Sequence, residues 1–197
     1  EFQAKDSLSA VILASDLTLT DCEINFGYSG ELSSLIIPEN SGFTMAMTGE
    51  NSYLHDIILQ GNGNRLHLTN GAYLEQDATI KNCLLKGTVR VGAQSVTFAG
   101  DSVTVLDTLQ SHSGFYNTVI CQSPLVNRGI IKDVGDTELY LQSTSDLINF
   151  GSWENDENTL KGTTDQFVDL TGGETFTSKI RMNAMIGNAD YQWYKNG

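Results

Sequence analysis

Hydrophobic and polar residues alternate in many short segments of the chain, which is the pattern of a β-strand with one buried face. In the clearest segments the first and third residues are apolar and would point inward. These segments read LTLT, MAMT, LHLT, VRVG and LYLQ, at residues 17–20, 45–48, 66–69, 89–92 and 139–142. Turn-forming glycine, serine, asparagine and aspartate recur between the apolar segments. We therefore predict an all-β protein.

Part of the sequence repeats with a fixed period. The pentapeptide LVNRG at residues 125–129 returns as LINFG at residues 147–151, an offset of 22 residues. Ile131 and Trp153 have the same offset, so the period extends beyond the pentapeptide. A fixed period of this size is typical of stacked structural repeats.

Two earlier matches have slightly longer offsets. Residues 66–69 align with residues 89–92 at an offset of 23, and SYLHDIILQG at residues 52–61 aligns with ATIKNCLLKG at residues 78–87 at an offset of 26. We interpret the variation as loops of different length between strands that stay aligned. A unit of 22 to 26 residues then holds three short strands and their turns.

These units predict a right-handed parallel β-helix, in which each strand pairs with its equivalent in the next coil. We assign residues 1–171 to it and residues 172–197 to a C-terminal cap or linker. Within the repeat, Asn127 and Asn149 are expected to hydrogen-bond to one another along the stack, and Gly129 and Gly151 to adopt positive φ. The alternative is a β-sandwich, which also has many short strands.

Charge narrows the possible partners. The 197 residues carry a formal net charge of −13, which opposes binding to a phosphate backbone, so we expect no nucleic-acid partner. No apolar stretch is long enough to cross a bilayer, so we expect no membrane insertion.

The three cysteines are predicted to be small buried hydrophobic residues. Cys22, Cys83 and Cys121 are odd in number and lack zinc-ligand spacing.

Two resemblances suggest where the protein acts. ADYQWYKNG at residues 189–197 resembles the opening of immunoglobulin-like or PKD-like modules of large bacterial surface and secreted proteins. The repeating region resembles, in its repeat style, the β-helices of bacterial haemagglutinin-type adhesins and of polysaccharide-active proteins. The resemblances imply a secreted or cell-surface location, further domains in the same chain, and a polysaccharide or a host or cell-surface glycan as partner.

Candidate ligand-binding residues follow from the predicted register. An offset of 23 would place His67 and Arg90 side by side at outward positions, with Ala46 nearby. Together with Tyr140 they form our predicted carbohydrate-binding residues, because planar and aromatic side chains suit sugar faces. We assign no catalytic residue. The acidic loop ENDEN at residues 154–158 lacks the ligand spacing of a calcium loop, so we assign no metal and no cofactor, although calcium stays possible.

The sequence therefore favours a non-catalytic extracellular β-solenoid module that acts in adhesion or as a rigid carbohydrate-facing scaffold. The alternative is a polysaccharide lyase or a glycoside hydrolase of the β-helix type. Such lyases pair a basic arginine or lysine with calcium-holding carboxylates, and such hydrolases use two carboxyl groups.

Overall fold

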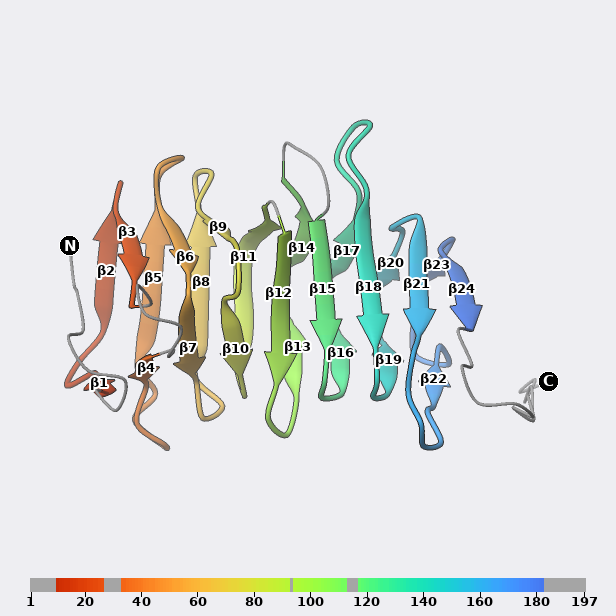
Figure 1. Ribbon diagram of the computed structural model, residues 1–197, viewed down its shortest axis with the longest axis horizontal. Coiled ribbons are helices and arrows are strands. Elements are labelled where there is room, and N and C mark those ends of the chain that lie inside the picture. Colours follow the sequence, from red (N-terminus) through yellow and green to blue (C-terminus); the bar gives the residue numbers. More distant parts are fainter. Residues whose placement is uncertain (1–9, 27–32, 93, 113–116, 183–197) are drawn as a thin grey trace.

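The protein is a parallel β-solenoid. The computed structural model describes residues 10–26, 33–92, 94–112 and 117–182, and within these ranges every regular element is a β-strand. The strands follow one another around the solenoid on three faces, which we call sheets A, B and C. Successive coils are stacked along the long axis of the molecule (Figure 1).

Sheet A is one continuous ladder of parallel strands. Its members in spatial order are β1 (Ala10–Ile12), β4 (Ser33–Ile36), β7 (Ile57–Gln60), β10 (Thr79–Lys81), β12 (Gln94–Ala99), β15 (Asn117–Cys121), β18 (Leu139–Ser143), β21 (Glu157–Leu160) and β24 (Lys179–Met182).

Sheets B and C are joined through β11 (Leu84–Val91), whose first half belongs to sheet B and whose second half belongs to sheet C. The other strands of sheet B are β2 (Leu17–Thr20), β5 (Thr44–Thr48), β8 (Arg65–Thr69), β13 (Val103–Val105), β16 (Leu125–Asn127), β19 (Leu147–Asn149) and β22 (Val168–Asp169). The other strands of sheet C are β3 (Glu23–Asn25), β6 (Tyr53–His55), β9 (Tyr73–Leu74), β14 (Thr108–Ser111), β17 (Ile130–Lys132), β20 (Ser152–Trp153) and β23 (Thr175–Phe176).

The predicted parallel β-helix is confirmed, and the β-sandwich is rejected. Every pair of the named strands is parallel, whereas a sandwich is built from antiparallel strands. The first and third residues of the alternating segments point inward as expected. On sheet B one inward column passes from Met45 through Leu66 and Leu85 to Val105, and all four side chains are buried.

The 22-residue period is confirmed where the sequence repeats most clearly. Leu125 pairs with Leu147, and Ile131 pairs with Trp153. The side-chain amide of Asn127 donates to Oδ1 of Asn149 at 2.8 Å, and both side chains are buried. The expected asparagine ladder is therefore present.

The predicted positive φ of the two glycines in the repeat is wrong. Gly129 and Gly151 are not among the described glycines that have positive φ. Both are needed because the preceding coil lies too close for a side chain. A Cβ on Gly129 would lie 1.9 Å from the carbonyl oxygen of Asp107, and a Cβ on Gly151 would lie 2.1 Å from the carbonyl oxygen of Gly129.

The predicted register of the earlier coils is wrong. His67 pairs with Lys86, an offset of 19, and Ile58 pairs with Thr79, an offset of 21. Apolar and polar residues alternate in the same way on the strands of all three sheets. The pattern therefore cannot show which strand of one coil pairs with which strand of the next. Gly87 marks the corner that the sequence did not reveal, because its φ of 76° bends β11 from sheet B into sheet C.

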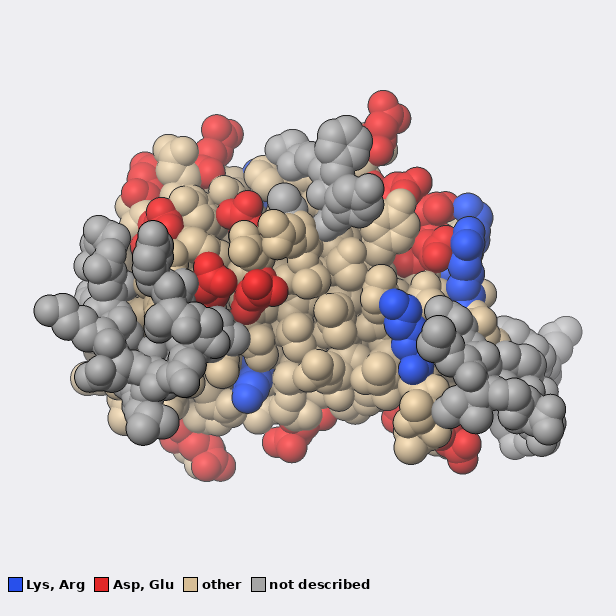
Figure 2. Space-filling model, viewed as in Figure 1, with Lys and Arg blue, Asp and Glu red and all other residues tan. Residues whose placement is uncertain are grey.

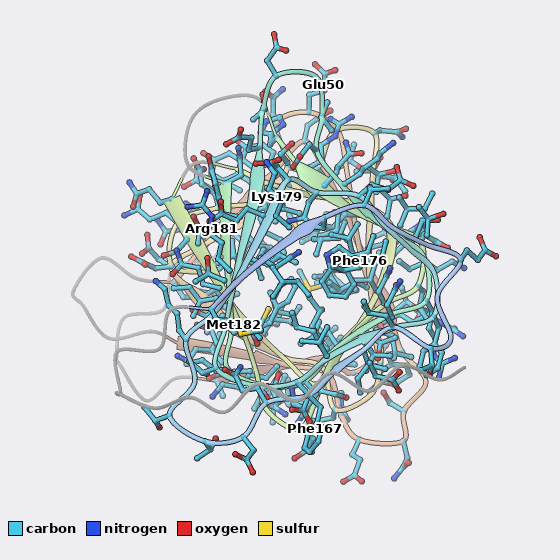
Figure 3. All side chains as sticks on the ribbon, turned by 90° about the vertical axis from the view of Figure 1, so that its right-hand side faces the viewer. Glu50, Phe167, Phe176, Lys179, Arg181 and Met182 are labelled. Carbon is cyan, nitrogen blue, oxygen red and sulfur yellow. The ribbon has the colours of Figure 1, made fainter. Side chains whose placement is uncertain are left out.

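The solenoid continues beyond residue 171, the limit that we expected. Strands β23 and β24 pair with β20 and β21 and extend the ladder to Met182. Figure 3 views this C-terminal end, where Phe176 lies over the interior of the last coil and Lys179 and Arg181 lie along β24. The ADYQWYKNG segment at residues 189–197 and the rest of residues 183–197 lie outside the described residues.

Two of the three cysteines are buried as predicted. Cys83 and Cys121 have almost no exposed surface, and burial raises the pKa of each thiol to about 12. Cys22 is partly exposed. All three thiols are free of disulfides.

Candidate functional site

The three predicted carbohydrate-binding residues lie on three different sheets. His67 is on β8 of sheet B, Arg90 is in the sheet C half of β11, and Tyr140 is on β18 of sheet A. Ala46 does pair with His67, as expected, but Arg90 pairs with Tyr73 and Gln110. The prediction that His67 and Arg90 lie side by side is therefore wrong, and the three residues do not form one site.

Arg90 belongs instead to a row of outward side chains on sheet C. The strand register places one residue of each coil over the next, about 4.8 Å apart along the axis. In spatial order the row contains Glu23, Tyr53, Tyr73, Arg90, Gln110 and Lys132. The row begins with an acid, continues with two tyrosines and ends with Arg90, the buried Gln110 and Lys132.

Aromatic rings stack along this part of sheet C. Tyr53 and Tyr73 stack with 5.2 Å between ring centroids and 16° between ring planes. Tyr73 also stacks on His112, with 4.5 Å between centroids and 26° between planes. We call Tyr53, Tyr73 and His112 the aromatic row. The sequence analysis did not identify any of its members.

Gly92 makes room for the aromatic row. It lies in the coil between those of Tyr73 and His112, because its amide donates to Leu74 and the amide of His112 donates to Val91. A Cβ on Gly92 would lie 3.1 Å from Cδ2 of Tyr73. The missing side chain lets the tyrosine ring lean across one coil and reach the imidazole.

The first tyrosine of the row is hydrogen-bonded to an acidic side chain. The Tyr53 hydroxyl donates to Glu23 at 2.8 Å, which helps to raise the pKa of Tyr53 to about 12. Nε2 of His55 lies 2.6 Å from the same carboxylate of Glu23, and Nδ1 of His55 lies 3.0 Å from Asp56. The hydrogen bonds from His55 and Tyr53 hold the pKa of Glu23 below its usual value.

Arg90 and Lys132 are the two cationic side chains of the row on sheet C. In the part of the chain that the structure describes, the ion pairs involve His55, Lys179 and Arg181 but neither Arg90 nor Lys132. Burial lowers the pKa of His112, and the charge of Arg90 lowers it further, so His112 is neutral near pH 7. The guanidinium of Arg90 therefore has donors available for a ligand beside a neutral imidazole.

This geometry determines what a ligand would contact. The ring faces of the aromatic row are used mostly within the row, so a ligand would meet ring edges, the Tyr73 hydroxyl, the imidazole of His112 and the guanidinium of Arg90. Closely spaced donors and acceptors on a rigid sheet suit hydrogen bonding to adjacent hydroxyl groups. Glu23 is held ionised, which suits a hydrogen-bond acceptor and is the opposite of the raised pKa that a general acid needs.

Four of the five side chains of the loop at residues 154–158 are engaged within the protein. Asn155 and Asn158 are buried and hydrogen-bonded, Asp156 pairs with Lys179, and Glu157 pairs with Arg181. Across the described ranges, no three His, Cys, Asp or Glu side chains are grouped so that they could hold a metal ion. The same ranges contain no helix long and apolar enough to cross a membrane.

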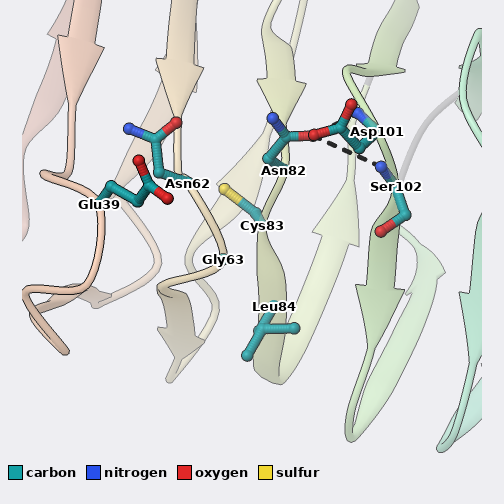
Figure 4. A pocket seen from close by; sticks show the side chains of 8 residues that line it. All are labelled: Glu39, Asn62, Gly63, Asn82, Cys83, Leu84, Asp101 and Ser102. Carbon is teal, nitrogen blue, oxygen red and sulfur yellow. Dashed lines mark hydrogen bonds between the residues drawn. The ribbon is translucent and has the colours of Figure 1, made fainter.

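A cavity of about 360 Å³ lies where the turns between sheets A and B meet (Figure 4). Its lining includes Glu39, Asn62, Asn82 and Asp101. The Asn82 side chain accepts hydrogen bonds from the backbone amides of Asp101 and Ser102 and so fixes the turn of the next coil. We interpret these asparagines as turn-stabilising residues, apart from the row on sheet C.

The geometry defines the class of the protein, a parallel β-solenoid with a polar and aromatic row on one of its three sheets. Comparisons with protein-family models, with curated proteins and with solved structures find no match.

Proposed function

We propose that this chain is a non-catalytic β-solenoid module that binds a glycan through the aromatic row and Arg90 on sheet C. The observation that carries the proposal is the stack of Tyr53, Tyr73 and His112 beside an arginine that has no acidic partner in the described structure. Such a site offers rigid apolar edges and several hydrogen-bonding groups to a ligand that is rich in hydroxyl groups.

The parallel stack supports a scaffold role. Each coil is hydrogen-bonded to its neighbours along three sheets, so residues on one sheet keep fixed distances along the axis. A glycan whose units repeat along its length would meet a surface that also repeats. We propose, from the sequence resemblances, that the module belongs to a larger bacterial protein that is secreted or displayed on the cell surface and acts in adhesion.

A glycan array with the purified chain tests the proposal. We expect the wild-type protein to bind a subset of glycans and Arg90→Ala to lose at least tenfold in affinity, because the guanidinium donors are removed. Arg65→Ala is the matched control, since Arg65 is an outward arginine on sheet B. Equal affinity of the two variants, or no glycan binding by the wild type, would reject the site.

The enzyme alternative is tested on the same preparations. Polysaccharides, including uronate-containing ones, would be incubated with the protein with and without calcium, and products would be measured by reducing ends and by absorbance of unsaturated sugars. We expect no product above a heat-denatured control. Product release that disappears in Arg90→Ala would establish a catalytic role and replace the proposal.

A further inference from the structure

Sheet A has an outward face without charged side chains in its middle. Two outward columns run side by side across β12, β15 and β18. Their members are Ser95, Thr118 and Tyr140 in one column and Thr97, Ile120 and Gln142 in the other. The second column continues without charge to Ile58 and Thr79 on one side and Thr159 on the other.

The face stands out because the whole protein carries a formal charge of −13. Figure 2 shows its centre as an uncharged area, with acidic and basic side chains at its margins. Charged side chains mark the limits of the face: the backbone amide of Asp77 donates to Ser95, Lys81 pairs with Ala99, and Glu157 pairs with Tyr140. Nζ of Lys161 donates to Oε1 of Gln142 at 2.6 Å. Sheet B has uncharged outward residues as well, but β13, β16 and β19 each present one outward residue, so no second column lies beside them.

Most side chains of the face are amphipathic, and Ile58 and Ile120 are its purely apolar members. Threonine offers a methyl group beside a hydroxyl, tyrosine a ring beside a hydroxyl, and glutamine an amide. The large apolar side chains with the greatest exposure in the described ranges are Ile12, Ile130, Val134, Phe150, Phe167 and Met182, and none of them belongs to β7, β10, β12, β15 or β18. The face therefore lacks the apolar anchors of a protein hot spot or a lipid-binding surface.

The dimensions of the face exclude a stable dimer. From β7 to β21 the second column is about 24 Å long, at about 4.8 Å per strand, and the strip is at most about 13 Å wide, where two columns lie side by side. The area is therefore at most about 300 Å², well below the roughly 800 Å² that each partner of a stable protein–protein interface contributes. A second copy would also bring two strongly acidic molecules together. A thin linear polymer fits a strip of this shape better.

We propose that this strip of sheet A binds an uncharged, extended polysaccharide that lies along the solenoid axis. Neutral sugars have apolar ring faces and many hydroxyl groups, which complement threonine, tyrosine and glutamine side chains and need no counter-charge. The periodic spacing of the columns lets successive sugar units make equivalent contacts. Tyr140, whose hydroxyl donates to Glu138, presents its ring to this second surface. The proposal does not depend on the site on sheet C.

Adsorption to insoluble neutral polysaccharides tests this inference. The purified chain would be incubated with microcrystalline cellulose, chitin or insoluble xylan, and the bound fraction measured by depletion from solution. We expect the wild type to adsorb to at least one of them and Thr97→Lys and Thr118→Lys to bind at least tenfold more weakly, because each places a hydrated charge in the strip. Circular dichroism would confirm that the variants are folded.

Matched variants separate this surface from others. Thr104→Lys makes the same change at an outward position of sheet B and is expected to adsorb like the wild type. Arg90→Ala, on sheet C, is also expected to adsorb normally. If Arg90→Ala lost adsorption while the two sheet A variants kept it, the inference would be overturned and the proposed site on sheet C would still stand. The inference would also be overturned by a wild type that adsorbs to none of the polymers, by full adsorption of Thr97→Lys, or by equal loss in Thr104→Lys.

Discussion

Tyr73 stacks on His112 with 4.5 Å between ring centroids although a whole coil of the solenoid separates the two residues. The contact exists because Gly92 occupies the intervening position and has no side chain. A ladder of parallel strands would normally bring only adjacent coils into side-chain contact. The aromatic row therefore depends on one glycine as well as on its own rings.

The first prediction concerns this glycine. Gly92→Ala should displace the Tyr73 ring, since the new Cβ would lie 3.1 Å from Cδ2 of Tyr73. Gly92 does not have positive φ, so the backbone tolerates alanine. We expect the near-ultraviolet circular dichroism of the tyrosines to change and the free energy of unfolding to fall by about 1 kcal/mol, the usual contribution of an aromatic pair. An unchanged tyrosine spectrum would show that the stack does not need the gap.

The second prediction concerns pH. The pKa of His112 is lowered in the folded protein, so the unfolded chain takes up a proton more readily than the folded chain. The contribution of His112 to stability is therefore fully present above its unfolded pKa of about 6.5 and is lost as pH falls through and below that value. We expect the wild type to lose more stability than His112→Phe between pH 7.5 and pH 5, measured by urea unfolding. Parallel pH profiles of the two proteins would contradict the assignment.

The third prediction concerns the buried asparagine ladder. The Asn127 amide donates to Asn149 and to the carbonyl of Ser152, and its Oδ1 accepts from the Gly129 amide at 3.1 Å. Asn127→Ala would leave these buried groups without partners, so we expect a loss of about 3 kcal/mol in the free energy of unfolding. Val126→Ala is the control, because Val126 points outward from the same strand, and it should cost less than 1 kcal/mol. Similar losses in both variants would argue against the ladder.

The fourth prediction concerns thiol reactivity. Burial raises the pKa of Cys83 and Cys121 to about 12, so neither thiol is ionised or accessible near neutral pH. Iodoacetamide should modify only Cys22 in the native protein and all three cysteines in urea, as read by mass spectrometry. Rapid native labelling of Cys83 would mean that the coils open at that position.

How much the sequence could predict depended on how closely two coils resemble each other. Leu125 and Leu147 were paired correctly because identical residues recur around them at one offset. His67 and Arg90 were paired wrongly because alternation shows which side of a strand faces inward but not which of three sheets the strand belongs to. A better signal was present in the Tyr-Leu dipeptides at residues 53–54 and 73–74, which pair in the structure and carry the aromatic row.

The remaining features of the candidate site arise from packing that no short motif encodes. The stack of Tyr73 on His112 needs Gly92, and the pairing of His55 with Glu23 spans an offset of 32 residues. Both depend on the lengths of the turns between strands, which differ from coil to coil. The chemistry of a β-solenoid surface can therefore be read only after the register of its coils is known.

The most direct test of the account is the nuclear Overhauser spectrum of a methyl-labelled sample, because everything else depends on the stacking of the coils. Leu125 lies between Val103 and Leu147 in one inward column of sheet B. The account predicts cross-peaks from the Leu125 methyl groups to those of both Val103 and Leu147. Their absence, with cross-peaks that fit antiparallel pairing instead, would contradict the β-solenoid and the sites derived from it.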